Sequence, residues 1–424
     1  MMKNIFALTV ITVLASQARA QLDNPLPGLT AEELAVFHQG KALFQHDMTV
    51  EEGLGPTFNA RSCVACHFQG GVGGGEAGIA NNVTHFGAQT EGRFIDLFEH
   101  GGPVLQKQSW LSEGMPEGDI CGLMPDVLPV GARDLITSQR HTPPIFGFGL
   151  IDAIADKDIL KREGSKGKFP GIRGVANWGV ELETVRAYAG FTAIRPRTQP
   201  GGAARVGRFG WHAPTATLFQ FSTEPFNIEL GVGTPFFPRE FHPQGTAPLP
   251  PECRLNGSQP NDTNSEMSVL LYAFQALTAP PPRGPITHDV KKGEKLFRKV
   301  GCQDCHTKSF KTVKDYYAIW PDGEAHRVEA LSNKTFEPWA DFLLHDMGPL
   351  LDDHRDQGRA SGRLWRTTPL WGIRYRTEFL HDGSVTTLDD AIAAHGGEGQ
   401  PSTNAYFALS EEEQEQVDQF LMSL

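Results

Sequence analysis

Two short strings in the sequence combine a pair of cysteines with an adjacent histidine. They are Cys-Val-Ala-Cys-His at residues 63–67 and Cys-Gln-Asp-Cys-His at residues 302–306. Thiols at this spacing can form thioether bonds to the two vinyl groups of a haem, and the neighbouring imidazole can then bind the iron. The sequence therefore predicts two covalently attached haems c. The predicted thioether positions are Cys63, Cys66, Cys302 and Cys305, and the predicted proximal iron ligands are His67 and His306.

A four-cysteine zinc site and a redox dithiol are the competing interpretations. Zinc sites normally separate two Cys-x-x-Cys pairs by a short loop, whereas residues 67–301 separate the pairs here and a histidine follows each. A thioredoxin-type dithiol lies near a βαβ pattern, which surrounds neither string. Both alternatives are disfavoured.

The first twenty residues have the order of a secretory signal. A lysine at position 3 precedes an apolar run from Ile5 to Leu14, and Ala-Arg-Ala ends the segment at residue 20. The apolar run is roughly half of the ~20 residues that span a bilayer. We expect cleavage before Gln21, a periplasmic mature protein and no stable membrane insertion.

The chain is acidic, with 38 lysines and arginines against 50 acidic residues and a formal net charge of −12. Nucleic acids and anionic membranes require clustered basic residues, which no stretch of the sequence supplies. Nucleic acid is therefore not an expected partner. The charge is compatible with a basic or weakly charged redox protein, and ordinary solubility explains it equally well.

Two cysteines lie outside the strings, Cys121 and Cys253. In an oxidising compartment a leftover pair is expected to form a disulfide, and two buried thiols are the alternative.

The chain reads as two unequal halves built on one plan. Each half has a helix ending in Leu-Phe, then a Cys-x-x-Cys-His string, and later a Thr-Pro segment. These elements lie at residues 40–44, 63–67 and 141–147 in the first half, and at 293–297, 302–306 and 367–372 in the second. A glycine-rich stretch at 70–78 lacks the Gly-Lys-Ser/Thr of a phosphate loop, which favours a flexible loop at a haem edge.

An apolar-periodic helix closes each half. Residues 266–277 close the first, and Ser410 with Glu413 predicts a capping box for the last helix. The side chains expected on one face of that last helix are Val417, Phe420, Leu421 and Leu424. The proline-rich run at 278–285 cannot continue a helix and predicts a domain boundary near residue 282.

The predicted fold class is mainly α, with two cytochrome c-like helical haem domains. The domains span residues 21–282 and 283–424, after a signal peptide at 1–20. Residues 164–257 are rich in glycine, proline and aromatic side chains, and we expect long irregular loops and short strands inserted there in the first domain.

Several longer segments resemble the bacterial di-haem oxidoreductase family. They lie at residues 55–67, 207–211, 343–349, 365–372 and 379–396. Members of that family are described as peroxidases or thiol oxidoreductases. The family belongs with the di-haem cytochrome c peroxidases and with di-haem enzymes that oxidise tryptophans in partner proteins. The resemblance covers nearly the whole mature chain and implies the two haems more firmly than the reaction.

The resemblance also implies further iron ligands. His395 matches the methionine that binds the C-terminal haem in di-haem peroxidases, and a histidine there usually lowers the haem potential. Met347 and His345 are rivals for the same iron, and a helix-capping role is the alternative for His395. At the N-terminal haem, His85 lies where resting peroxidases have a displaceable histidine, although a surface-loop histidine would look the same.

Peroxide cleavage requires a side chain that moves a proton to the departing oxygen. The peroxidases carry a carboxylate after their first Thr-Pro segment, and the first carboxylates after that segment here are Asp152 and Asp156. Glu229 is an equally good candidate. Trp211 is a candidate electron relay between the haems, with packing against porphyrin as the alternative.

Three functions remain open at this stage. In the leading hypothesis, the N-terminal haem reduces peroxide or another small oxidant, and a soluble cytochrome c or cupredoxin exchanges electrons with the C-terminal haem. The second is electron transfer without turnover, favoured by His395 and the lack of a clear distal acid. The third is oxidative modification of a partner protein or organic substrate. Calcium, which the peroxidases bind between domains, cannot be assigned because Thr368 and Pro369 mark a matching segment without identifiable oxygen ligands.

Overall fold

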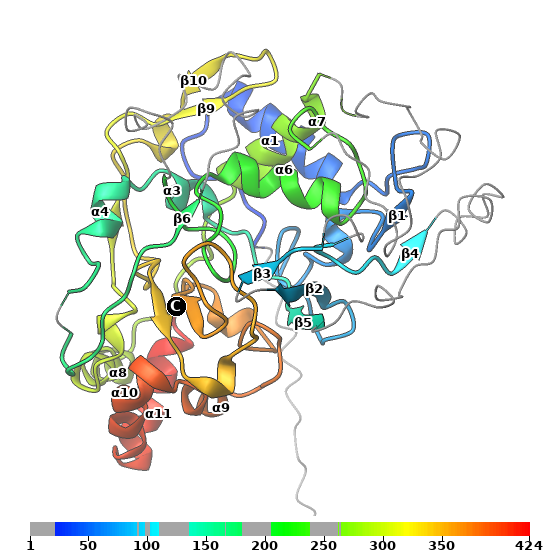
Figure 1. Cartoon of the computed structure of the whole chain (residues 1–424). Coiled ribbons are helices and arrows are strands. Elements are labelled where there is room, and N and C mark those ends of the chain that lie inside the picture. The colour runs from blue at the N-terminus through cyan, green and yellow to red at the C-terminus, as the bar shows by residue number, and fades with distance from the viewer. Residues whose placement is uncertain are drawn as a thin grey trace, which may run out of the picture.

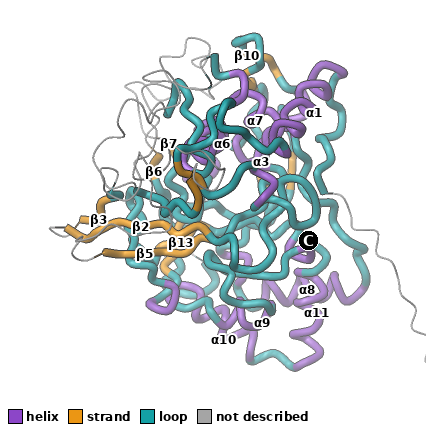
Figure 2. Tube along the Cα trace, turned by 90° about the vertical axis from the view of Figure 1, so that its right-hand side faces the viewer, coloured by secondary structure: helices purple, strands orange, loops and turns teal. Residues whose placement is uncertain are grey.

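The computed structural model describes residues 22–90, 93–97, 102–109, 135–165, 167–179, 205–237, 262 and 264–424. Helices and small antiparallel sheets are joined by long loops (Figures 1 and 2). The predicted signal peptide and the predicted Cys121–Cys253 disulfide lie outside the described residues. Among the described helices, none has the length and apolar character needed to cross a membrane.

The α-helices are α1 (Ala31–Gln45), α3 (Phe148–Asp152), α4 (Asp156–Leu160), α6 (Leu218–Ile228), α7 (Glu266–Leu277), α8 (His288–Lys299), α9 (Leu388–Ala393), α10 (Gln400–Phe407) and α11 (Glu411–Leu421). The strands of the first half are β1 (Thr57–Phe58), β2 (Val83–Thr90), β3 (Arg93–Ile95), β4 (Gln108–Ser109), β5 (Leu135–Arg140), β6 (Trp178–Gly179) and β7 (Arg205–Val206). Those of the second half are β8 (Phe310–Lys311), β9 (Tyr317–Ile319), β10 (Ala325–Arg327), β11 (Thr335–Phe336), β12 (Leu344–Asp346) and β13 (Leu364–Arg366).

Short 3-10 turns carry both strings, η1 (Cys63–Ala65) and η5 (Cys302–Asp304). Further 3-10 turns are η6 (Glu329–Leu331), η7 (Pro349–Leu351), η8 (Ile373–Tyr375) and η9 (Gly397–Gly399).

The helix that precedes each string packs closely against the helix that closes the same half. Helix α1 packs against α7, and α8 packs against α11 (Figure 1). A Cβ atom on Gly40 would lie 2.2 Å from the carbonyl oxygen of Leu270, and one on Gly293 would lie 1.8 Å from that of Gln416. Each glycine stands three residues before the Leu-Phe pair of its helix. The repeat seen in the sequence therefore has a physical basis, because only glycine permits this approach of the two backbones.

The two closing helices form as predicted. Helix α7 has the predicted bounds, and the Ser410–Glu413 capping box is present at the start of α11. The predicted apolar face of α11 is buried, with Val417 and Phe420 at 1% and 0% exposure.

The prediction of only loops and short strands in residues 164–257 was wrong for residues 218–228, which form helix α6. The short strands β6 and β7 are present, but α6 is an 11-residue helix that even contains Pro225. Its N-cap Thr217 accepts a hydrogen bond from the backbone N–H of Gln220, and Phe219 and Phe226 are buried. Burial of these aromatic side chains, rather than a regular apolar period, stabilises the helix.

The largest hydrophobic core includes side chains from both sides of the predicted boundary near residue 282. Residues of α1, α6 and α7 pack there with side chains from positions 310–343. A smaller core joins α8 and α11. The position of the boundary stays a prediction, since the segment after the second string contributes to the core of the first half.

Replacing Gly293 by alanine should destabilise the protein because the new methyl group has no room against α11. Overpacking of this kind costs about 1–3 kcal/mol. Thermal unfolding should show a lower midpoint for G293A than for K292A, which alters an exposed position on the same helix. An unchanged midpoint for G293A would contradict the packing argument.

Candidate functional site

The first string places His67 against the glycine-rich loop. Its Nδ1 lies 3.0 Å from the carbonyl oxygen of Gly74, and because a carbonyl can only accept, Nδ1 carries the proton. Burial lowers the pKa of His67 to about 4, although the carbonyls of Gly74 and Pro143 oppose the shift. The imidazole is therefore neutral, which is the form that binds iron.

The second string repeats this arrangement. The Nδ1 atom of His306 lies 2.9 Å from the carbonyl oxygen of Trp339, which comes from the loop before β12. Burial lowers the pKa of His306 to about 4, and the nearby His395 contributes in the same direction. Both string histidines are thus neutral and fixed through the same ring nitrogen.

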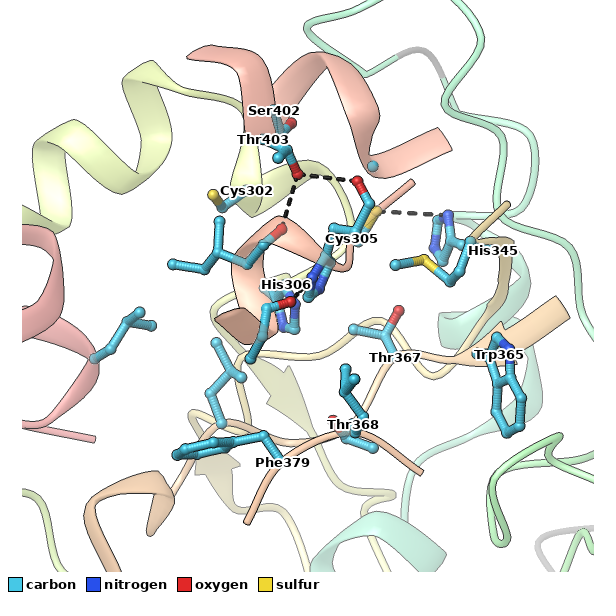
Figure 3. A pocket seen from close by; sticks show the side chains of 18 of the residues that line it. Cys302, Cys305, His306, His345, Trp365, Thr367, Thr368, Phe379, Ser402 and Thr403 are labelled. Atoms are coloured by element: carbon cyan, nitrogen blue, oxygen red, sulfur yellow. Dashed lines mark hydrogen bonds between the residues drawn. The ribbon is translucent and has the colours of Figure 1, made fainter. Parts of the chain in front are cut away.

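A cavity opens beside the second string, with Cys302, Cys305 and His306 in its wall (Figure 3). It encloses about 1510 Å³ of space, part of it open to solvent. Most of the lining is apolar, and the lining residues include Ile172, Phe297, Trp365, Leu370, Phe379 and Ile392.

His395 lies in the wall of the same cavity as His306. Its Nδ1 is 2.7 Å from the carbonyl oxygen of Ala391, and burial lowers its pKa. The Thr403 hydroxyl donates to the carbonyl oxygen of His395 at 2.9 Å and holds the turn after α9. In the described part of the chain, the Nε2 atoms of His306 and His395 form no hydrogen bond. The predicted pair of axial ligands is therefore brought together in one cavity.

The two rivals of His395 lie in the cavity wall as well, but His345 is otherwise engaged. Its Nε2 lies 3.0 Å from Asp341 and its Nδ1 lies 2.8 Å from Glu398. Although burial opposes the shift, these carboxylates raise the pKa of His345 well above its ordinary value. An imidazolium with both nitrogens occupied has no lone pair for iron. Met347 keeps its side chain in the cavity wall.

None of the four string cysteines forms a disulfide. Burial raises the pKa of Cys63, Cys66 and Cys302 to about 12 and also raises that of Cys305. Zinc binds thiolates, and no group of three or more His, Cys, Asp or Glu side chains among the described residues could hold a metal ion. The arrangement offers no support for the zinc alternative or for a calcium site.

Two arginines in the cavity wall, the buried Arg366 and the half-buried Arg376, were not singled out from the sequence. Burial lowers the pKa of both Arg366 and Arg376 to about 10. Within the described residues, Nη2 of Arg376 is buried without a hydrogen-bond partner. A buried guanidinium calls for an anionic partner, and a haem carries two propionates. The cavity, the paired imidazoles and this unpartnered guanidinium together fit a haem.

His141, in the first Thr-Pro segment, connects the two strings. Its backbone N–H donates to the carbonyl oxygen of His381 at 2.7 Å, and its own carbonyl accepts from Nε1 of Trp211 at 3.1 Å. Both Trp211 and His381 line the cavity. On the other side, the Nδ1 atom of His141 lies 2.8 Å from Glu76, which helps to raise the pKa of the Cys66 thiol.

Of the three carboxylates considered from the sequence, Glu229 lies near the first string. Asn59 donates to it at 2.7 Å, and burial raises its pKa to about 7. Its charge also raises the pKa of Cys66. At neutral pH this carboxyl group can therefore both give and take a proton.

The other two carboxylates are engaged in structural contacts. Asp152 accepts from the backbone N–H of Leu218 at 2.8 Å and from the hydroxyl of Tyr316 at 2.5 Å. Asp156 pairs with Arg205 and Arg208, and although burial opposes it, these guanidinium groups lower the pKa of Asp156. Asp152 and Asp156 are therefore each bound to groups that help to hold the fold together.

His85 lies on β2, opposite Ser138 of β5. Burial lowers its pKa well below the ordinary value, and the charges of Arg355 and Arg140 act in the same direction. In the described part of the chain its Nδ1 is buried without a hydrogen-bond partner. It is thus a half-buried histidine on a strand rather than a surface-loop one, and its role at the iron stays a prediction.

Glu76 is the functional candidate that sequence reasoning missed. It is fully buried, and the hydroxyl of Thr142 donates to it at 3.1 Å. The sequence feature that could have identified Glu76 is that it is the single carboxylate within the glycine-rich stretch after the first string.

A model of the family described as "Di-haem oxidoreductase, putative peroxidase" matches residues 130–424 of this chain. The chain belongs to the di-haem oxidoreductase family. The matched range of this di-haem oxidoreductase includes both Thr-Pro segments, Glu229 and the second string, whereas the first string precedes it. Membership makes the protein a haem-dependent redox enzyme.

Two solved structures are similar to this di-haem oxidoreductase at low identity. Kuenenia stuttgartiensis hydrazine synthase is 13% identical, with 100% of both chains covered and a TM-score of 0.36. A MauG-like protein associated with microbial copper homeostasis is 16% identical, with 94% of this chain and 92% of that chain covered and a TM-score of 0.37. No curated protein matches.

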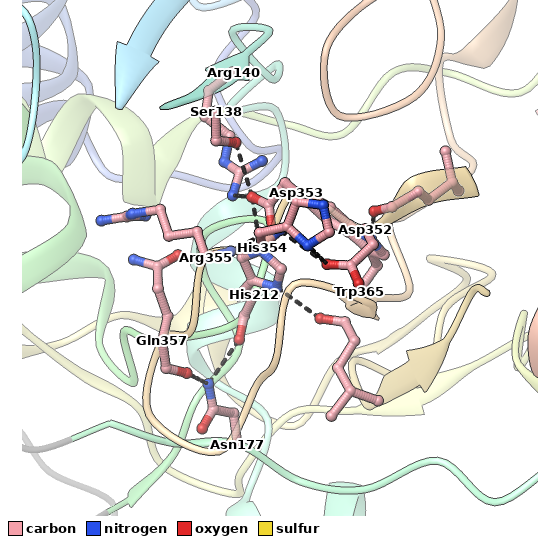
Figure 4. A network of polar contacts seen from close by, with 12 residues as sticks. Ser138, Arg140, Asn177, His212, Asp352, Asp353, His354, Arg355, Gln357 and Trp365 are labelled. Carbon is pink, nitrogen blue, oxygen red and sulfur yellow. Dashed lines mark hydrogen bonds and ion pairs between the residues drawn. The ribbon is translucent and has the colours of Figure 1, made fainter. Parts of the chain in front are cut away.

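A buried polar network supports the cavity wall of the di-haem oxidoreductase (Figure 4). Asp353 accepts hydrogen bonds from Arg140 and, at 2.8 Å, from Ser138. The ring of Trp365 stacks between those of His212 and His381, at centroid distances of 4.2 and 3.9 Å. The network therefore ties β5, which leads into His141, to a wall of the cavity.

Proposed function

We propose that this protein is a periplasmic di-haem c-type oxidoreductase that reduces peroxide or another small oxidant at its N-terminal haem. Electrons enter through the C-terminal haem. The observation that carries the proposal is the shared geometry of His67 and His306, each neutral and bound through Nδ1 to a backbone carbonyl, directly after a Cys-x-x-Cys pair.

Each half of the chain would hold one haem in a cytochrome c-like domain. Cys63 and Cys66 would bind the first haem covalently, with His67 as ligand. In the second half, the proposed thioether residues are Cys302 and Cys305, the proposed ligands are His306 and His395, and Arg376 would pair with a propionate. The haem supplies a reducible iron at each site.

Glu229 is the proposed proton-transfer group. Its raised pKa places it between its two protonation states near neutral pH, where proton transfer in either direction is efficient. Asn59 orients the carboxyl group through one oxygen. Glu229 would take a proton from the incoming oxidant and return it to the departing oxygen.

Trp211 is the proposed link between the haems. It borders the C-terminal cavity and donates to the carbonyl of His141, whose side chain reaches Glu76 beside the first string. The position of Trp211 is compatible with electron transfer between the haems and also with packing against a porphyrin.

A second candidate function is electron transfer without turnover. It is favoured by the shared cavity of His306 and His395, because two imidazole ligands would leave no open position at that iron. The two functions differ at the N-terminal site, where turnover requires an accessible iron. In either case the proposed partner is a small soluble cytochrome c or cupredoxin.

Mass spectrometry of the exported protein tests the cofactor. The wild type should carry two haem additions, and C302A/C305A should carry one, because thioether bonds need both sulfurs. A colourless wild-type protein would disprove the proposal of two covalently bound haems.

The substitution E229Q should lower the rate of peroxide reduction roughly 10²–10⁴-fold, the usual contribution of a proton-transfer group. In the wild type the rate should rise as pH increases through about 7, since the carboxylate is the base. The pH step should be absent in E229Q.

A matched control is E224Q, because burial also raises the pKa of Glu224 to about 7 on the same helix. Equal losses in E224Q and E229Q would show a general effect on α6 rather than proton transfer.

The substitution H395M should raise the potential of the C-terminal haem by on the order of 0.1 V, within the roughly 0.8 V range that axial ligands span. Spectroelectrochemical titration measures the shift. M347L should leave the potential and the visible spectrum unchanged. The opposite pattern would assign the iron to Met347.

A further inference from the structure

Helix α8 has a basic outer face in an acidic protein. Its buried residues Val290, Gly293 and Phe297 face the interior of the molecule. The remaining surface is exposed and carries the side chains that we call the basic face: Lys291, Lys292, Lys295, Arg298 and Lys299. In the sequence, Glu294 and apolar residues separate these basic residues, whereas the helical turn gathers them on one side of α8.

Among the described residues, two of these five basic side chains, Lys291 and Lys295, are not compensated, whereas Lys292 lies 3.9 Å from Asp289. Glu294 pairs with Arg298 and also with Lys308, and Lys299 lies 3.5 Å from Glu413. In the described part of the chain, by contrast, no carboxylate lies within 4.0 Å of the Nζ atoms of Lys291 and Lys295. Surface ion pairs contribute little to stability, so the cluster has no evident role in the fold.

The basic face lies next to the C-terminal cavity. Helix α8 runs directly into the second string, and Phe297, Gly301 and Cys302 all line the cavity. Lys168, from the loop before β6, donates to the carbonyl oxygen of Lys299 and extends the positive charge around the same edge. The cavity lies on the buried side of α8, so a redox protein seated on the basic face would be separated from the proposed haem by about the diameter of the helix, roughly 10 Å.

The neighbouring helix has the opposite charge. Helix α11 packs against α8 and carries Glu411, Glu412, Glu413, Glu415 and Asp418 (Figure 1). Adjacent patches of opposite sign orient an approaching charged protein and so select one docking geometry.

We propose that the basic face of α8 docks a small acidic electron-transfer protein that exchanges electrons with the C-terminal haem. This inference rests on the proposed function and adds the charge of the partner. It also differs from the interpretation of the net charge, which was compatible with a basic or weakly charged partner. Local complementarity governs the bound geometry, whereas the net charge of −12 acts only over longer distances.

The test uses the haem-loaded enzyme reduced with dithionite, from which excess reductant has been removed. Stopped-flow spectroscopy follows its oxidation by oxidised plastocyanin, which is acidic, and by oxidised mitochondrial cytochrome c, which is basic. Both acceptors have high potentials, so electron transfer is downhill in each case. The rate constants are measured at low and high ionic strength.

The key variant is K291E/K295E, and the matched control is K311E/K314E. Both change the net charge equally at exposed lysines. Lys311 ends β8, and Lys314 lies in the segment between β8 and β9, outside α8. We expect K291E/K295E to slow oxidation by plastocyanin at least roughly tenfold at low salt, within the 10–10³ range of electrostatic steering. The control should stay within about twofold of the wild type.

Three outcomes would overturn the docking proposal. They are equal rates with plastocyanin for K291E/K295E and the control, a plastocyanin rate that does not fall with salt, or loss of the cytochrome c reaction in K291E/K295E. Preferential binding of the basic face to phosphatidylglycerol vesicles, with no effect on plastocyanin, would assign it to a membrane instead. Failure of dithionite to produce any reduced haem spectrum would mark a failure of the proposed function itself.

Discussion

In both Cys-x-x-Cys-His segments, the histidine after the second cysteine donates its Nδ1 proton to a backbone carbonyl. This bond fixes the tautomer and leaves Nε2 as the only nitrogen with a lone pair. The carbonyl comes from the glycine-rich loop for His67 and from the loop before β12 for His306. The close helix crossings at Gly40 and Gly293 and the buried cores behind them serve to hold these carbonyls in place.

Burial sets the chemistry of the surrounding groups. It keeps His67, His306 and His395 neutral and raises the pKa of Glu229, since a low-dielectric interior disfavours charge. His345 lies in a similar interior but carries a charge, because Asp341 and Glu398 flank it. The difference between His345 and His395 therefore comes from their neighbours and not from their depth.

The two halves meet through His141 and the buried network around Asp353. A Cβ atom on Gly383, in the His-Asp-Gly segment, would lie 2.8 Å from Nδ1 of His141. This contact leaves no room for a side chain at position 383, and its positive φ of 69° also favours glycine. The segment that resembles the peroxidases thus acts here as a contact between the halves, in addition to leading into α9 and His395.

Local patterns in the sequence were enough to locate the strings, the bounds of α7 and the capping box of α11. Each depends on residues a few positions apart, so spacing alone carries the information. Helix α6 was missed because its stability comes from burial of Phe219 and Phe226 in a core built from distant segments.

Tertiary structure alone distinguished Glu229, near Cys66, from Asp152, which is bound by Tyr316, and it alone placed His395 and His306 in the wall of one cavity. It also gathered the separated lysines of α8 into one face. These relations join residues far apart in the chain or arise from the helical turn, and long loops with no period of their own bring them together. The sequence by itself determined which residues could bind haem, and the fold decided which of them face one another.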